Sequence, residues 1–180
     1  MKKVLLKIIK ELNKARIVYT LVGGIASQWY GSLRTTIDID ISLLIDENGL
    51  EKLLKIFKKL KLKFDKRELE ILFKIGNRFC VYDRNNVRID FWLAKTALER
   101  QFIKERKKIK IKNLQTYIIA PENLILSKLL VGREKDLEDV LFILKNMLKE
   151  KSINLIKLRQ KIKAFGLSKE FKKLWKKLTK

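Results

Sequence analysis

Residues 37–41 read Ile-Asp-Ile-Asp-Ile, an alternation of acid and isoleucine inside an otherwise apolar run. Successive side chains of a β-strand point to opposite faces, so Asp38 and Asp40 would share one face, roughly 6.5–7 Å apart, while the three isoleucines point towards the core. Two carboxylates at this distance repel each other, and each is easier to protonate than an isolated one. Because a cation would remove that cost, the run predicts a strand with a cation site on its polar face.

The side chains available for chemistry are restricted, since the sequence contains no His and a single Cys, Cys80. These absences exclude His-ligated zinc, a serine triad that uses His, a cysteine-cluster metal site and an intramolecular disulfide. Cys80 lies between Phe79 and Val81 and is expected to be a small buried apolar residue. A bound metal must then have oxygen ligands, which favours Mg²⁺ or Mn²⁺.

The chain is strongly basic, with 43 Lys or Arg residues against 20 Asp or Glu and a net charge of +23. Such an excess is typical of proteins that bind polyanions such as nucleic acid or nucleotides. A Lys- and Ile-rich composition from an AT-rich or high-temperature source explains the same excess. The Lys-rich helical patterns at 152–165 and 168–179, with Lys180 after them, either bind RNA or only cover the core.

Length and hydropathy favour one compact domain, with or without a small appendage. No apolar run approaches the roughly 20 residues of a membrane span, so no membrane partner is expected. Lys7, Lys10, Glu11 and Lys14 interrupt the N-terminal apolar residues with helical spacing, which predicts an amphipathic helix of a cytoplasmic protein. The oligomeric state stays open.

Apolar periodicity and turn residues predict an α+β fold. Helices are expected at 3–15, 24–30, 48–60, 65–76, 121–132, 134–148, 152–165 and 168–179. Strands are expected at 17–23, 37–45 and 116–120, with a hairpin at 78–94 that turns near Asp83–Asn86. We therefore expect a mixed sheet flanked by helices in residues 1–114 and a helical region in 115–180.

Two further features accompany the acids at 38 and 40. Gly23-Gly24 falls at a strand-to-helix turn, where a backbone without side chains can approach a phosphate closely. Asp90 lies within the apolar run Val-Arg-Ile-Asp-Phe-Trp-Leu. If the two strands pair, three carboxylates converge, a ligand set suited to two divalent cations.

Each acid also has a simpler interpretation. Asp38 and Asp40 could form an ordinary exposed strand face. Asp90 could pair with a nearby base such as Arg88 or Lys95.

Together these residues resemble the signature of the nucleotidyltransferase superfamily, which has a DNA polymerase beta-like fold. In that signature a hydrophobic residue and two small residues, here Val22-Gly23-Gly24, precede an acid-hydrophobic-acid-hydrophobic motif, here thirteen residues later at Asp38–Ile41. Arg34 and Thr36 make the motif similar to that of the minimal and toxin-type members.

The resemblance implies that a nucleoside triphosphate such as ATP is bound through Mg²⁺ or Mn²⁺ and that its nucleotidyl group passes to an acceptor hydroxyl. Asp38 and Asp40 would hold the metals, and Asp90 would ligate one of them or deprotonate the acceptor. The nucleotide would be bound by Gly23, Gly24, Ser32, Arg34 and Thr36. Gly24 stands where many active members have Ser, so one hydroxyl contact to phosphate is missing. The acceptor would be RNA, tRNA or a protein.

Residues 120–140 resemble a helical segment of prokaryotic nucleotidyltransferase-like proteins, a group similar to abortive-infection nucleotidyltransferase toxins. The matching positions are Lys128 and the Asp136-x-x-Asp139 motif, and the resemblance implies that Lys128 and Asp136 line the catalytic site. Alternatively, Lys128 is a solvated lysine, and the two acids pair with Arg133 and Lys135.

Three functions stay open from the sequence. The first is a metal-dependent nucleotidyltransferase, and the second is a nucleotide- or nucleic-acid-binding module that keeps the fold without catalysis. The third is an interaction protein, for example in a toxin–antitoxin system. Nucleotide incorporation into RNA or protein separates the first two.

Overall fold

The computed structural model describes residues 1–178 and divides into two compact units. Unit 1 comprises Met1–Ile25 and Thr36–Ile119, and unit 2 comprises Ala26–Thr35 and the chain from Ala120 onward. The chain passes from unit 1 into unit 2 within the short helix α2 (Gly23–Trp29) and returns two residues before Asp38.

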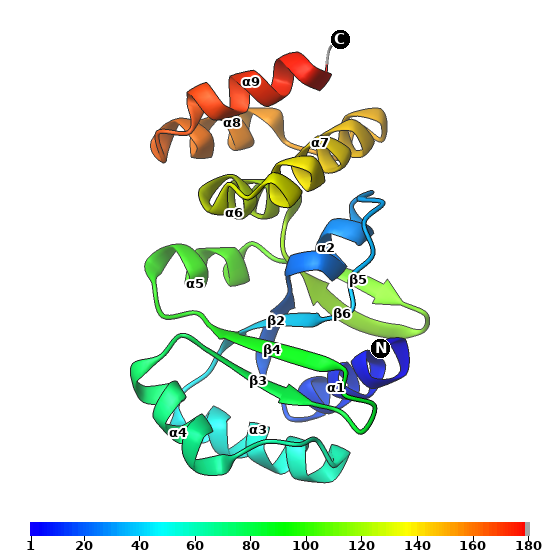
Figure 1. The fold of residues 1–180 in the computed structure, drawn as a ribbon, viewed down its shortest axis with the longest axis vertical. Coiled ribbons are helices and arrows are strands. Elements are labelled where there is room, and N and C mark those ends of the chain that lie inside the picture. Colours follow the sequence, from blue (N-terminus) through cyan, green and yellow to red (C-terminus); the bar gives the residue numbers. More distant parts are fainter. Residues whose placement is uncertain (179–180) are drawn as a thin grey trace. The chain divides into compact units, whose positions relative to one another are not determined.

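Unit 1 is built on a six-stranded mixed sheet with the strand order β3-β4-β2-β1-β6-β5 (Figure 1). The strands are β1 (Val18–Leu21), β2 (Ile39–Leu44), β3 (Arg78–Tyr82), β4 (Arg88–Leu93), β5 (Lys107–Ile111) and β6 (Leu114–Ile118). β2 pairs parallel with β4 and antiparallel with β1, and β3–β4 and β5–β6 are antiparallel hairpins. β2, which carries Asp40, therefore lies in the middle of the sheet.

The helices of unit 1 lie on both faces of this sheet. They are α1 (Lys2–Lys14), α3 (Glu47–Leu60), α4 (Lys66–Ile75) and α5 (Ala97–Lys104), with the first residues of α2. In Figure 1, α1, α3 and α4 lie together on one side, and α5 lies on the other.

Period-2 alternation places the apolar side chains of β2 and β4 in the core of unit 1. Ile39, Ile41 and Phe91 are fully buried, and the ring of Phe57 from α3 lies 5.1 Å from that of Phe91. Each such side chain contributes about 1.5–3 kcal/mol when removed from water. Ile37 is 80% exposed, because β2 begins only at Ile39, so the expectation that Ile37 faces the core is wrong.

Unit 2 is helical and is formed by the segment 26–35 with α6 (Pro121–Val131), α7 (Glu134–Lys149), α8 (Leu155–Ala164) and α9 (Ser168–Leu178). α6 has no separate polar face, and most of its residues are buried, including Glu122 and Lys128, so it is the central helix of this unit. It begins with Pro121 in its first turn and ends at Gly132, whose φ of +69° suits glycine. α8 and α9 bury their apolar stripes within this unit.

The predicted helices and strands are all present, with ends that differ by a few residues. The last residue of the helix predicted at 168–179 and Lys180 lie outside the described residues. The prediction missed α5 and β5. α5 has a sequence signal in Thr96 and Glu99, which form a capping box, and β5 alternates Lys with Ile along the edge of the sheet. No helix in residues 1–178 is long and apolar enough to cross a membrane.

Candidate active site

The candidate site of unit 1 is the polar face at the beginning of β2 and β4. The two strands run parallel with Asp40 directly opposite Asp90, and Asp38 immediately precedes β2. We call this surface, with Asp38, Asp40 and Asp90, the acidic face. The expected pairing of the two acid-bearing strands is thus present. Asp90 is buried, with 5% of its surface exposed, and Asp38 and Asp40 are half-buried.

The carboxylate of Asp40 is held by two N–H donors. The indole Nε1 of Trp92 donates to Oδ1 over 3.3 Å, and the backbone N–H of Gly24 also donates to the carboxylate. Burial raises the pKa of Asp40, and the nearby carboxylates of Asp90 and Asp38 raise it further, although the two hydrogen bonds oppose the shift. The charge on Asp40 is therefore costly unless a cation joins it.

Gly23 and Gly24 are required by close approaches of the chain. Gly23 has a φ of +59°, and a Cβ on it would lie 2.6 Å from Cγ of Asp40. A Cβ on Gly24 would lie 2.6 Å from Cβ and Oγ1 of Thr36. The packing of the protein itself therefore requires glycine at both positions, because the turn lies directly against Asp40 and against Thr36.

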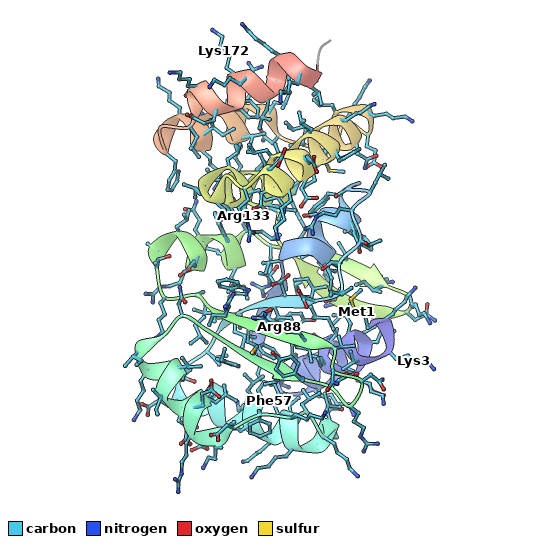
Figure 2. The ribbon with its side chains drawn as sticks, viewed as in Figure 1. Met1, Lys3, Phe57, Arg88, Arg133 and Lys172 are labelled. Atoms are coloured by element: carbon cyan, nitrogen blue, oxygen red, sulfur yellow. The ribbon has the colours of Figure 1, made fainter. Side chains whose placement is uncertain are left out.

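Asp90 is paired with two arginines. Arg88 donates from Nη2 to Oδ1 over 3.0 Å, and Nε of Arg78 lies 3.9 Å from the same oxygen. Of the two partners considered from the sequence, Arg88 is the one observed, while Lys95 donates to the backbone carbonyls of Phe73 and Lys74 instead. Arg88, labelled in Figure 2, therefore neutralises Asp90 from the same face of β4.

The acidic face supplies only part of a metal coordination shell. Within residues 1–178, no group of three or more Cys, Asp or Glu side chains is arranged to hold a metal ion. The convergence of the three acids into a site for two divalent cations thus stays a prediction. The donor set nevertheless fits Mg²⁺ or Mn²⁺, because carboxylate oxygens suit hard cations and Mg²⁺ commonly takes one or two carboxylates with substrate phosphates and waters. The mutual repulsion at Asp40 is a cost that such a cation would remove.

Unit 2 contains a second group of charged residues, which we call the ion cluster. Nζ of Lys128 lies 2.6 Å from Oδ2 of Asp139 and 3.1 Å from Oδ1 of Asp136. Nε of Arg133 donates to Oδ2 of Asp136 over 2.6 Å. Lys128 is only 5% exposed, so it is not a solvated lysine, and Asp136 pairs with Arg133 and Lys128 rather than with Lys135.

The ion cluster also holds the segment 26–35. The hydroxyl of Ser32 donates to Oδ1 of Asp139, and Nη2 of Arg34 lies 3.3 Å from Oδ2 of the same residue. Two residues expected at the nucleotide, Ser32 and Arg34, therefore lie together with Lys128 and Asp136. Thr36, another residue expected at the nucleotide, belongs to unit 1, where its hydroxyl donates to the carbonyl of Asp38 over 3.3 Å.

Both acids of the ion cluster are stabilised in their charged form. Burial alone would raise the pKa of Asp139, but hydrogen bonds from Lys128 and Ser32 and the charge of Lys128 outweigh it and lower the pKa. Asp136 follows the same pattern, because hydrogen bonds from Arg133 and Lys128 outweigh burial. The cluster is thus a satisfied network of charges.

Several residues of the acidic face were not recognised as site residues from the sequence. Arg78 lies opposite Trp92 in the β3–β4 hairpin, with its guanidinium 4.9 Å from the centre of the Trp92 ring. Cys80 is opposite Asp90 and is half-buried, so the expectation that it is buried is wrong. The sequence contained a signal for these residues, because alternate residues of a strand point to the same face. Arg88 and Trp92, two positions on either side of Asp90, therefore share its face.

The order of the elements and the paired acids at the beginning of parallel strands define a nucleotidyltransferase-like α+β fold. The chain belongs to the DUF6036 family, described as nucleotidyltransferases of unknown function, whose family model matches residues 3–175. No curated protein matches the sequence.

Solved structures with a similar fold include nucleotide-transferring enzymes. The solution structure of the antibiotic-resistance factor ANT(2″)-Ia has a TM-score of 0.63 at 16% identity, with 91% of each chain covered. The lincosamide antibiotic adenylyltransferase LnuA, bound to lincomycin, has a TM-score of 0.55 at 16% identity, with 79% of this chain and 96% of that chain covered. JHP933 from Helicobacter pylori has a TM-score of 0.54 at 20% identity, with 96% of this chain and 75% of that chain covered. At these identities the similarity is one of fold.

Proposed function

We propose that the protein is a metal-dependent nucleotidyltransferase that transfers a nucleotidyl group from a nucleoside triphosphate to the hydroxyl of an acceptor. The single observation that carries the proposal is Asp40 directly opposite Asp90 on parallel strands, with the Gly23–Gly24 turn against the Asp40 carboxylate. Membership of the family and the fold support the reaction class. Transfer of this kind depends mainly on positioning and charge neutralisation, which a chain without His can provide through carboxylates.

Asp38 and Asp40 would hold Mg²⁺ or Mn²⁺. When bound, the metal neutralises the triphosphate and stabilises the attacking and leaving oxygens. The raised pKa of Asp40 supports this assignment, because a carboxylate that is costly to ionise alone gains most from a neighbouring cation. Trp92 and Gly24 orient Asp40 through their N–H groups.

Asp90 would either complete the metal site or accept the proton of the acceptor hydroxyl. Its Oδ1 accepts a hydrogen bond from Arg88, so each role would use Oδ2 or would require Arg88 to release Oδ1. Arginine binds phosphate as well as carboxylate, so a bound triphosphate offers Arg88 an alternative partner. Arg78 and Arg88 would then contribute positive charge beside the nucleotide.

Within unit 1, the nucleotide would also be bound by Gly23, Gly24 and Thr36. Ser32 and Arg34, which the resemblance also assigns to the nucleotide, belong to unit 2, where both bind Asp139. Arg34 is exposed, and its guanidinium has further N–H groups that would suit phosphate oxygens. Lys128 pairs with both Asp136 and Asp139, so these residues would hold Ser32 and Arg34 in place.

The proposal is tested by incubating the protein with each nucleoside triphosphate, labelled at the α-phosphate, together with total cellular RNA and protein. Label that enters RNA or protein in a Mg²⁺-dependent manner identifies the acceptor class, and a toxin that modifies tRNA is one specific form of this outcome. Asp40→Asn should abolish the incorporation. Nucleotide binding without any incorporation would instead identify a non-catalytic binding module.

A further inference from the structure

A basic groove lies in unit 1 on the side of the sheet that carries α1 and α3. It has a volume of about 530 Å³ and is bounded by α1, the end of α3 and the β3–β4 turn. Its cationic lining residues are Lys3, Lys7, Lys10, Lys59, Lys61 and Arg84. The lining also includes two acids, Glu11 and Asp83.

Both acids of the basic groove are already engaged. Glu11 pairs with Lys59, whose Nζ lies 2.6 Å from Oε2. Oδ1 of Asp83 accepts hydrogen bonds of 2.8 Å from the backbone N–H groups of Asn85 and Val87, so this carboxylate shapes the turn. The positive charge of the groove is therefore only partly compensated.

Three lysines of α1 supply most of the uncompensated charge. Lys3, Lys7 and Lys10 are exposed and follow one another at helical spacing on one face, and none of the three forms an ion pair with any described residue. The side chain of Lys3 points away from the ribbon in Figure 2. The three cations thus form a row along the helix, which fits an extended polyanion better than a single small anion.

The helices of unit 1 differ in how far acids balance their basic residues. α4 mixes Lys66 and Arg67 with Glu68 and Glu70, and Lys66 pairs with Glu70 over 3.4 Å. On α1 the only acid is Glu11, and it is already paired with Lys59.

The basic groove and the acidic face lie near the same end of the sheet but on opposite faces, because Phe91 packs against Phe57 of α3 and its neighbour Asp90 points to the other face. Arg84 lies in the turn that leads into β4, and Asp90 is the third residue of β4. β2 runs parallel to β4 with Asp40 opposite Asp90, so both acids lie near the end of the sheet where the turn lines the groove.

We propose that the basic groove binds the phosphate backbone of RNA. RNA binding by the groove stands by itself and does not rest on the proposed function. Phosphates repeat regularly along an RNA chain, and ammonium groups neutralise them without reading the sequence.

The test measures binding of a fluorescein-labelled single-stranded RNA of mixed sequence by anisotropy, at several salt concentrations and in EDTA. Because EDTA removes divalent metal, the result does not depend on nucleotidyl transfer. The test variant combines Lys3→Gln, Lys7→Gln and Lys10→Gln, all at exposed positions where Gln preserves helix propensity. Each phosphate contact contributes about 0.7 to the salt slope for single strands, so the variant should lower the slope by about 2.

A control variant removes the same charge from exposed positions of α7 in unit 2. It combines Lys135→Gln, Lys145→Gln and Lys149→Gln. The groove variant should lose at least about tenfold in RNA affinity, while the control keeps the affinity and salt slope of the unmodified protein. A control variant that loses as much as the groove variant, or a groove variant that loses nothing, would overturn the proposal. Polyglutamate that displaces RNA as well as unlabelled RNA does would also overturn it, since the groove would then fit an acidic protein equally.

Discussion

Asp40 and Asp90 lie opposite each other on parallel central strands, but a positive charge neutralises only one of them among the described residues. Asp90 has the guanidinium of Arg88 at 3.0 Å, whereas Asp40 accepts hydrogen bonds from the neutral N–H groups of Trp92 and Gly24. The acidic face is thus asymmetric, with one compensated and one uncompensated carboxylate. The uncompensated one, Asp40, is the position where an added cation gains most.

Asp40→Asn should raise the thermal stability of the metal-free protein at neutral pH by a few degrees. The pKa of Asp40 is raised on folding, so the folded state binds a proton more readily than the unfolded state. Its contribution to stability is present below the unfolded pKa and is lost as pH rises through the folded pKa. The gain from Asp40→Asn should therefore shrink as pH falls towards the ordinary pKa of Asp, which melting curves over a pH series in EDTA will show. A gain that grows towards low pH would contradict the assignment.

Arg88→Gln should leave the buried carboxylate of Asp90 without its closest partner and lower the metal-free stability by about 1–3 kcal/mol. Mg²⁺ should then stabilise this variant more than the unmodified protein, because the metal no longer competes with a guanidinium. Arg67→Gln, at an exposed position of α4, serves as the control and should change neither quantity. The free energy of unfolding is measured by denaturant titration with and without Mg²⁺. If Mg²⁺ raises it by the same amount in all three proteins, Arg88 and the metal do not share Asp90.

Gly24→Val should destabilise the protein without any nucleotide, because the new side chain would overlap Thr36. Overpacking of this kind typically costs about 1–3 kcal/mol. Thr36→Gly removes the overlapping atoms, so the double variant should be more stable than the sum of the single changes predicts. Purely additive losses in a double-mutant cycle of unfolding free energies would show that the two residues do not meet.

Lys128→Met should destabilise unit 2 by about 3–5 kcal/mol, because it leaves Asp136 and Asp139 buried without their shared cation. Both acids have lowered pKa values, so the stability they contribute is present above their unfolded pKa and is lost as pH falls through the folded value. The acid limb of the stability curve should flatten in the variant. Lys145→Met on the exposed side of α7 is the matched control. Equal urea midpoints for the two variants would show that the ion cluster contributes nothing to stability.

Local patterns were sufficient to predict most of the elements, whereas the pairing of the two acid-bearing strands was only a condition for the acids to converge. The alternation around Asp38 and Asp40 follows from the strand period, and the helix ends follow from caps and glycines. The hydrogen bond between Ser32 and Asp139 joins residues 107 positions apart, and no local pattern encodes it. The contact of Gly24 with Thr36 likewise depends on how the chain returns to the sheet. β5 was missed because its Lys-rich alternation is stable only as an edge paired with β6.

The central claim is that the acidic face binds a nucleoside triphosphate together with a divalent metal. Its most direct test is calorimetric titration of each nucleoside triphosphate into the protein, with and without Mg²⁺. The comparison includes Asp40→Asn and a control, Glu51→Gln, on the exposed surface of α3 in the same unit. We predict Mg²⁺-dependent binding by the unmodified protein and by Glu51→Gln, and loss of the Mg²⁺-dependent part in Asp40→Asn. Equal Mg²⁺-dependent binding by Asp40→Asn would contradict the claim.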